Sequence, residues 1–404
     1  MDVKLVQHAV GQGGLFSGTL SAGGKPLRWA YDCGSNQADA LAREIATVAA
    51  GGDLDLLFLS HLDSDHVNGI DKLLSRVKVR EVVLPYLDEE TIVATLARDA
   101  GQESLSGVFV EAVGDLAGWF GSRGVETITF VDGRTDEEGD GPVVPGAPEG
   151  GGEGDCETKW TREAEEISDP ITAERQATGT ARMQRVAPDA ALIVSTPNSQ
   201  LNWALVPYVH QPSSAQKKAF DDVLEAEFGK ISKKEIAQAA KDPAVRKRLR
   251  DCYDALWSDH NLVSMTLYAG PISKGPIGVE LRARPIYHDW RWRRDADQVG
   301  GWMLTGDAHL NGVRRRQRFL KFYERFTPMI NVLMLPHHGS IHNHSVEVLD
   351  AMPELWIGFA AAGPNSYGHP HEDVRDAVKA HRRASFHKVG EKRSSQIVME
   401  IRMP

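Results

Sequence analysis

Four side chains that commonly bind metals fall within six residues, in the order His61-Leu62-Asp63-Ser64-Asp65-His66, directly after an apolar run at residues 54–59. A buried strand that ends in several charged groups cannot leave them unpaired without a large cost in free energy, and a bound cation satisfies several carboxylates at once. The residues that follow begin a helix whose positive N-terminus favours anions. The stretch therefore predicts a metal site at a strand end. The alternative is a polar turn or helix cap that is rich in Asp and Ser by chance.

This cluster has enough ligands for two metal ions. In an irregular turn, His61 and Asp63 can face one ion while Asp65 and His66 face a second. A carboxylate from elsewhere in the chain would be needed to hold the pair together. We therefore expect two divalent ions and a bridging residue outside this stretch.

The bulk composition is that of a folded protein. A hydrophobic content of 41% and a charged content of 25% are ordinary for globular proteins, and we expect one elaborated domain over the 404 residues. No run of 18 apolar residues and no leader pattern occurs, which favours a cytoplasmic protein without membrane contact. The three cysteines, Cys33, Cys156 and Cys252, are far apart, which fits a reducing compartment and gives no zinc spacing.

Charge is unevenly distributed along the chain. The net charge of -10 argues against a generic binder of polyanions. Two Arg-rich segments, residues 291–294 and 314–318, nevertheless lie late in the chain, with Trp290, Trp292 and Phe319 beside or within them. They could guide single-stranded DNA or RNA through phosphate contacts and stacking. The alternative is that these Arg side chains lie on solvated faces.

The order of apolar and polar segments predicts an α/β fold. Strands are expected at residues 3–8, 27–31, 56–59 and 79–84, with helices at 38–50 and 68–76. Residues 132–155 are rich in Gly, Pro, Asp and Glu and predict a surface loop, and residues 213–257 are charged and helical in pattern. Strand patterns return at residues 263–268, 301–304, 332–335 and 355–360. We expect residues 1–130 and 260–404 to form two halves of one core, and residues 131–259 to form an acidic loop and a mainly helical insertion.

Further candidate ligands follow the later strands. Asp307 comes after the apolar run Trp302-Met303-Leu304 and is the candidate for the bridging carboxylate. His337 and His338 follow the strand expected at residues 332–335, and we favour His338 as the ligand. His337 is either a supporting group or the ligand itself if the turn is rotated.

Three more histidines are weaker candidates. His369 could bind a phosphoryl oxygen or donate a proton to a leaving oxygen, and His371 and Tyr367 lie beside it. His260, just before the strand expected at residue 263, is the remaining candidate for a metal ligand. Lone histidines are, however, usually structural.

Seven blocks of the sequence, taken in order, resemble the metallo-β-lactamase fold, and most closely the hydrolase domain of the ComEC competence proteins. The blocks are Val10-Gly11-Gln12-Gly13, Tyr31-Asp32-Cys33-Gly34, residues 60–69, residues 261–264, Leu304-Thr305-Gly306-Asp307, His337-His338-Gly339-Ser340 and Tyr367-Gly368-His369-Pro370. The resemblance implies a four-layer αββα sandwich with a two-metal site at one edge of the sheets. It also implies phosphodiesterase or nuclease activity.

The resemblance assigns roles within residues 1–130 and 260–395. His61 and Asp63 would bind one metal, Asp65 and His66 the other, Asp307 would bridge, and His338 or its neighbour would complete the set. Asp32 would support the site from beneath. Candidates for supporting the ligands or contacting substrate are Asp32, His337, Ser340, Tyr367 and His371.

The chain departs from the family pattern at two positions. Asp63 stands where the wider superfamily more often has His, and a carboxylate there admits Mn²⁺ beside Zn²⁺. Gly14 stands where the ComEC branch usually has Asp.

The leading hypothesis is hydrolysis of phosphodiesters by a metal-activated water, with Asp65 also able to accept the proton of that water. A second hypothesis keeps the hydrolase but gives it a small phosphoester or nucleotide substrate, with the insertion as a lid. A third makes the chain a metal-stabilised binding subunit, in which the helical insertion recruits a protein partner.

Overall fold

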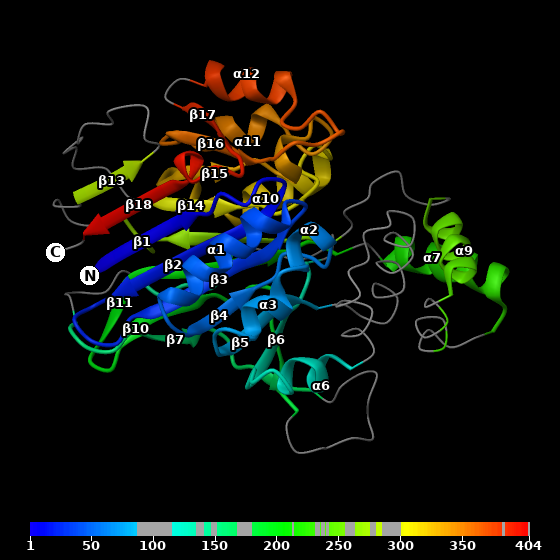
Figure 1. Ribbon diagram of the computed structural model, residues 1–404, viewed down its shortest axis with the longest axis horizontal. Helices are drawn as coiled ribbons and strands as arrows, with labels where there is room; N and C mark the ends of the chain where they lie inside the picture. The colour runs from blue at the N-terminus through cyan, green and yellow to red at the C-terminus, as the bar shows by residue number, and fades with distance from the viewer. Residues whose placement is uncertain are drawn as a thin grey trace.

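The structure is a computed structural model that describes residues 1–86, 115–134, 141–146, 152–167, 180–211, 214–230, 235, 239, 242–254, 263–274, 280–284, 300–381 and 384–402. Two large mixed sheets stack on each other and carry helices on their outer faces (Figure 1). This arrangement agrees with the expected α/β sandwich.

The first sheet has ten strands among the described residues, in the order β13-β18-β1-β2-β3-β4-β5-β6-β9-β8. Strands β3 to β6 and β9 run parallel, and the rest pair antiparallel. The bounds are β1 (Asp2–Gln7), β2 (Gly13–Ser21), β3 (Leu27–Ser35), β4 (Leu54–Phe58), β5 (Val79–Pro85), β6 (Thr127–Val131), β8 (Glu165–Glu166), β9 (Arg182–Val186), β13 (Glu280–Arg284) and β18 (Ile397–Arg402).

The second sheet has eight strands in the described part of the chain, in the order β17-β16-β15-β14-β12-β11-β10-β7. Strands β14 to β17 are parallel and the others antiparallel. The bounds are β7 (Glu157–Trp160), β10 (Leu192–Thr196), β11 (Ser199–Val209), β12 (Met265–Gly270), β14 (Gly301–Leu304), β15 (Ile330–Met334), β16 (Ile357–Ala361) and β17 (Ser385–Val389).

The helix α1 (Ala38–Ala50) covers the outer face of the first sheet because it buries one apolar stripe. In α1, Leu41, Ile45 and Val48 recur at helical spacing and are buried against the first sheet. The other helices are α2 (Ser64–Val67), α3 (Ile70–Leu74), α6 (Leu116–Gly121), α7 (Ser214–Phe228), α9 (Pro243–Asp254), α10 (Val313–Phe322), α11 (Val346–Asp350) and α12 (Glu372–Ala380), with short 3-10 turns η1 (Thr327–Met329), η2 (His337–Gly339) and η3 (Arg393–Ser395).

Large aromatic side chains fill the space between the two sheets. Phe16 of the first sheet packs on Trp302 of the second, with ring centroids 5.0 Å apart, and also on Trp29. All three side chains are fully buried. Burial of these apolar side chains between the sheets stabilises the contact between them. The two halves of the chain therefore share one core.

The segment at residues 131–259 differs in content from the expected loop and helical insertion. Among its described residues, five strands, β7 to β11, extend both sheets. Helical structure is described at α7 and α9, which project to one side of the sandwich in Figure 1. These strands were not expected, because the acidic composition of residues 132–155 indicated a loop at the start of the segment. Strands β10 and β11 nevertheless carry runs of buried apolar residues.

Among the described residues, no helix combines the length and apolar composition needed to cross a membrane.

Candidate metal centre

The predicted ligands lie where strands of both sheets end at one edge of the sandwich. His61 to His66 follow β4, Asp307 follows β14, and His338 follows β15. The backbone N–H of Met265, at the start of β12, donates to the carbonyl of Ser60 over 2.7 Å and so joins the two sheets at this edge. Residues that are more than 240 positions apart in sequence therefore meet at one place.

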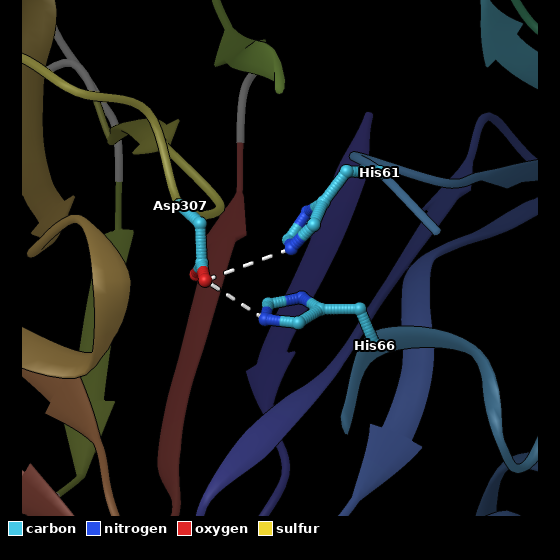
Figure 2. Close-up of side chains that lie close together, drawn as sticks. All are labelled: His61, His66 and Asp307. Carbon is cyan, nitrogen blue, oxygen red and sulfur yellow. Dashed lines mark ion pairs between the residues drawn. The ribbon is translucent and has the colours of Figure 1, made fainter. Parts of the chain in front are cut away.

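A first ligand group consists of His61, His66 and Asp307. One ligand atom from each lies within 4.8 Å of the others, and all three residues are buried (Figure 2). The Nε2 atom of His66 lies 3.2 Å from Oδ1 of Asp307, and the Nε2 atom of His61 lies 3.6 Å from Oδ2. Asp63 adds a carboxylate oxygen 3.5 Å from Nε2 of His61.

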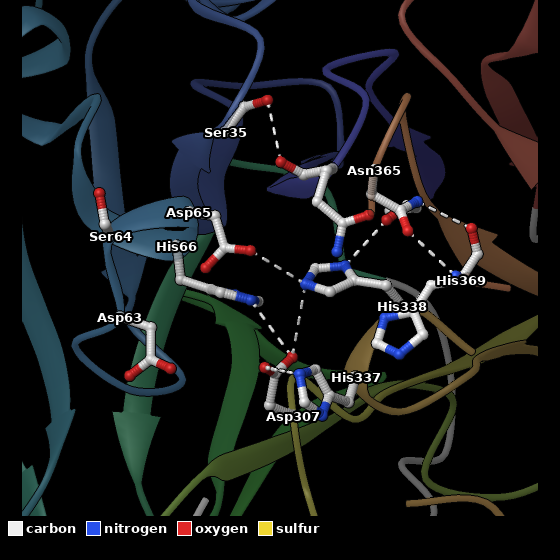
Figure 3. A network of polar contacts seen from close by, with 12 residues as sticks. Ser35, Asp63, Ser64, Asp65, His66, Asp307, His337, His338, Asn365 and His369 are labelled. Atoms are coloured by element: carbon white, nitrogen blue, oxygen red, sulfur yellow. Dashed lines mark hydrogen bonds and ion pairs between the residues drawn. The ribbon is translucent and has the colours of Figure 1, made fainter. Parts of the chain in front are cut away.

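A second ligand group consists of Asp65, His66 and His338, again with ligand atoms within 4.8 Å of one another (Figure 3). Nε2 of His338 lies 3.1 Å from Oδ2 of Asp65 and 3.9 Å from Oδ1 of Asp307. The Asp307 carboxylate thus reaches residues of both groups. That is the position the sequence predicts for a bridging residue.

The protein fixes the proton on the same nitrogen of each of these imidazoles. Nδ1 of His66 donates to Oδ2 of Asp32 over 2.8 Å, and Nδ1 of His338 donates to the carbonyl of Ala361 over 2.8 Å. Nδ1 of His61 lies 2.8 Å from Oγ of Ser60, whose own proton goes to Asp32, so the imidazole is the donor in this pair.

As a result, the Nε2 atoms point into the centre. The Nε2 atoms of His61, His66 and His338 are buried and have no hydrogen-bond partner among the described residues. Histidine ligands are usually held in this way, with the other ring nitrogen donating to a carboxylate, a carbonyl or a similar group. Imidazole nitrogens and carboxylate oxygens form a donor set that fits Zn²⁺ or Mn²⁺.

The electrostatics of the centre also favour a cation. Burial would raise the pKa of Asp307, but the surrounding imidazoles of His337, His66, His61 and His338 hold it well below its usual value. Burial likewise opposes ionisation of Asp65, but the nearby imidazole of His338, with Nε2 3.1 Å from Oδ2 of Asp65, and the charge of His66 lower its pKa to about 2. The carboxylates are therefore ionised at neutral pH, and a metal can replace the protons on the imidazoles that balance them.

Asp32 lies beneath the ligand groups, at the position that the family resemblance implies for a supporting residue. Its carboxylate accepts from the backbone N–H of Ser60 (2.7 Å), from Oγ of Ser60 (2.8 Å) and from His66. Asp32 has a φ of 57°, a conformation that Asp tolerates better than most residues. A Cβ on Gly14 would lie 2.9 Å from Cβ of Asp32, so this chain has little room for the Asp that the ComEC branch usually has there.

The two adjacent histidines of η2 point in different directions. His338 is buried within the second group, whereas the side chain of His337 is 31% exposed, with Nε2 3.6 Å from Oδ2 of Asp307. His337 also pairs through Nδ1 with Oδ1 of Asn343 (3.1 Å). This geometry favours His338 as the ligand and places His337 at the solvent-exposed edge of the metal centre.

Two residues that sequence reasoning missed hold the backbone of Asp307. Oγ of Ser264 accepts from the N–H of Asp307 over 3.1 Å, and Nδ2 of Asn343 donates to its carbonyl over 3.0 Å. Neither residue type has a metal-ligand pattern, and although Ser264 lies in the block at residues 261–264, that block gave no role for its side chain.

The remaining candidates lie outside the two ligand groups. The centroid of the His369 ring lies 5.3 Å from that of His337 and 6.5 Å from that of His338 (Figure 3). The ring of Tyr367, a residue that is 70% exposed, lies 5.9 Å from that of His369. His371 accepts from the N–H of Asp373 (3.2 Å) and caps α12. The buried Oγ of Ser340 accepts from the N–H of His342 over 3.3 Å, so Ser340 shapes the turn after η2.

The Arg-rich segment at residues 314–318 does not form one uniform basic face. Arg316 is buried and bonds to Glu347 (2.6 Å) and to the carbonyls of Leu310 and Asn311. Phe319 is fully buried, so it cannot stack on a nucleobase as expected from the sequence. His260, Trp290, Trp292 and residues 291–294 lie outside the described residues.

Replacing Asp32 with Ala is expected to weaken metal binding by about 10-fold to 100-fold, because His66 then loses the group that fixes its proton and orientation. The measurement is a competition titration with a metal chelator. The same substitution at Asp39, an exposed residue of α1, is the control and should leave the affinity unchanged. Equal affinities for both variants would show that Asp32 does not support the centre.

The comparison with protein families adds one match. Residues 31–155 match the model of the metallo-beta-lactamase superfamily, whose members are usually hydrolases. This range contains Asp32 and the stretch from His61 to His66. A comparison with curated proteins gave no match, so the narrower resemblance to ComEC hydrolase domains stays an expectation. The family match and the two ligand groups together indicate a metal-dependent hydrolase.

Proposed function

We propose that this protein hydrolyses phosphodiester bonds, as a phosphodiesterase or nuclease, with two divalent ions at the metal centre. The observation that carries the proposal is the pair of ligand groups that share His66 and lie around the Asp307 carboxylate. Two adjacent ions held in this way are typical of enzymes that cleave phosphate esters.

The residues divide between the two ions according to which side of Asp307 they face. His61 and Asp63 would hold one ion, Asp65, His66 and His338 the other, and Asp307 would contact both. When bound, such ions acidify a water molecule and stabilise the negative charge that develops on the phosphate.

Asp65 is the proposed acceptor for the proton of the attacking water. Its side chain is 20% exposed, whereas that of Asp307 is 3% exposed, so Asp65 lies on the solvent-facing side of the two ligand groups. Its pKa of about 2 keeps the carboxylate ionised at neutral pH, which a proton acceptor requires.

His369 is proposed to contact the phosphate or the leaving oxygen as a neutral donor. Burial and the neighbouring imidazoles of His337 and His338 lower the pKa of His369 to about 4, so its ring is uncharged at pH 7. Its buried Nδ1 atom has no hydrogen-bond partner among the described residues. A neutral N–H group can stabilise a phosphoryl oxygen without transferring its proton.

The test is a substrate panel on purified protein loaded with Zn²⁺ or Mn²⁺. We expect turnover of bis(p-nitrophenyl) phosphate and of single-stranded DNA or RNA, and loss of turnover when a chelator removes the metal. Metal-dependent hydrolysis of a carboxylic ester or lactam, with every phosphodiester left intact, would contradict the proposal.

A small phosphoester or nucleotide remains the second candidate substrate, and the net charge of -10 favours it. The two classes differ in their response to salt. Binding of single-stranded DNA should weaken steeply between about 50 and 200 mM salt if phosphate contacts hold a strand. Turnover of small phosphodiesters without any binding of DNA or RNA at low salt would show that the substrate is a small molecule.

A further inference from the structure

A small cavity lies beside the metal centre, on the other side of the turn that carries Asp307. Strands β11, β12 and β14 are neighbours, so His210, Ser264 and Asp307 follow one another along the same sheet edge. Ser264 lines the cavity and also accepts the backbone N–H of Asp307 over 3.1 Å. The cavity and the metal centre therefore share a wall.

Two buried polar groups line this cavity and lack hydrogen-bond partners among the described residues. They are the hydroxyl of Tyr208, whose residue is 3% exposed, and Nδ1 of His210. The Tyr208 ring is fixed by Phe322, with centroids 4.9 Å apart, so the hydroxyl is held in place. A buried polar group without a partner is costly, and two in one cavity indicate that the cavity takes a polar guest.

The charge on the cavity wall favours an anion. Arg315, in the first turn of α10, lines the cavity together with His210 and Tyr208, and none of the lining residues is an Asp or Glu. Burial, followed by the charge of Arg315, lowers the pKa of His210 to about 3. The imidazole is therefore neutral, while the guanidinium supplies positive charge at the same place.

We propose that this cavity binds a phosphate group of the substrate other than the one that is cleaved, through Tyr208, His210 and Arg315. The cavity has a volume of about 20 Å³, enough for roughly one water-sized group. One phosphoryl oxygen enters, while the rest of the phosphate stays at the mouth. The substrate class is then a phosphodiester that carries a second phosphate close to the scissile bond, and this assignment rests on the proposed function.

The first experiment compares two dinucleotides on the metal-loaded protein, one with and one without a 5′-phosphate. Charge-assisted hydrogen bonds to the extra phosphate should raise kcat/KM by about tenfold. Tyr208→Phe, which keeps the packed ring, and Arg315→Gln should each bring the ratio of the two kcat/KM values toward one. Lys321→Gln, on the exposed side of the same helix, is the matched control and should keep the ratio. A ratio of one in the unmodified protein, with both dinucleotides cleaved, would overturn the proposal.

The second experiment measures binding without turnover and separates this proposal from the proposed function. Inorganic phosphate is titrated into the metal-loaded protein while the ring signals of His210 are followed by NMR, with His210→Gln used to assign them. We expect a saturable shift that Arg315→Gln abolishes. Such a shift in a protein that cleaves no dinucleotide would support the anion site and contradict phosphodiesterase activity. No shift at millimolar phosphate would show that the cavity holds a water only.

Discussion

Replacing Asp307 with Asn is expected to reduce metal-dependent turnover by about a thousandfold or more. A catalytic metal supplies several kcal/mol of transition-state stabilisation, and each 1.36 kcal/mol corresponds to a factor of about ten in rate. Asn keeps the shape of the side chain and leaves the backbone contacts of residue 307 with Ser264 and Asn343 in place. It removes the negative charge that lies between the two ligand groups. Steady-state kinetics on bis(p-nitrophenyl) phosphate measure the loss.

The control for this prediction is the same substitution at an exposed position. Asp350, at the end of α11, is exposed and lies in no ligand group, so Asp350→Asn should retain full turnover. Circular dichroism should show that both variants are folded. If Asp307→Asn kept within a few-fold of the original rate, Asp307 would not be the bridging ligand.

The second large effect concerns stability and involves Glu44, a fully buried carboxylate of α1 that belongs to neither ligand group. It accepts hydrogen bonds from His8 (3.2 Å), Arg43 (2.9 Å), Arg393 (3.1 Å) and Gln396 (2.7 Å). Glu44→Ala leaves these donors without their acceptor. We expect the free energy of unfolding to fall by about 3 to 5 kcal/mol, measured by urea denaturation.

The stability that Glu44 contributes also depends on pH. Burial alone would raise the pKa of Glu44, but the hydrogen bonds from His8, Arg43 and Arg393 outweigh it and lower the pKa from 4.5 to about 2. The folded state therefore binds the proton more weakly than the unfolded state. The contribution of Glu44 to stability should be complete above pH 4.5 and should decline as the pH falls toward 2.

The matched control for Glu44→Ala is Glu400→Ala. Glu400 lies on β18 with its side chain 47% exposed and pairs with Lys4 at 3.7 Å. Exposed pairs of this kind contribute about 0 to 1 kcal/mol, so this variant should be nearly as stable as the original protein. Equal losses for both substitutions would contradict the role given to the buried cluster around Glu44.

Local patterns in the sequence predict some elements closely. The structure has α1 at Ala38–Ala50 and β14 at Gly301–Leu304, the ranges expected from periodicity and flanking glycines. The strand at β2 (Gly13–Ser21) was not expected, because its three glycines and two serines weaken the strand pattern. The pairing of β18 with β1 could not be expected from local patterns either, since it joins opposite ends of the described chain.

The metal centre shows the same division between local and distant information. Ligand-type residues directly after apolar strands, such as His61 and Asp307, can be recognised from their immediate neighbours in sequence. The choice of His338 over His337 depends on the η2 turn, where both residues have positive φ and their side chains diverge. The cavity beside Ser264 depends on three strands being neighbours in the sheet, and no local pattern contains that information.

The most direct test of the account is the metal content of the purified protein. After loading with Zn²⁺ or Mn²⁺ and removal of free metal, elemental analysis should give about two divalent ions per chain, as expected for a two-metal site. Asp307→Asn should lose at least one of them, because its charge lies between the two ligand groups. A folded protein that retains no metal after loading, or an Asp307→Asn variant with unchanged metal content, would contradict the claim that these residues form a metal centre.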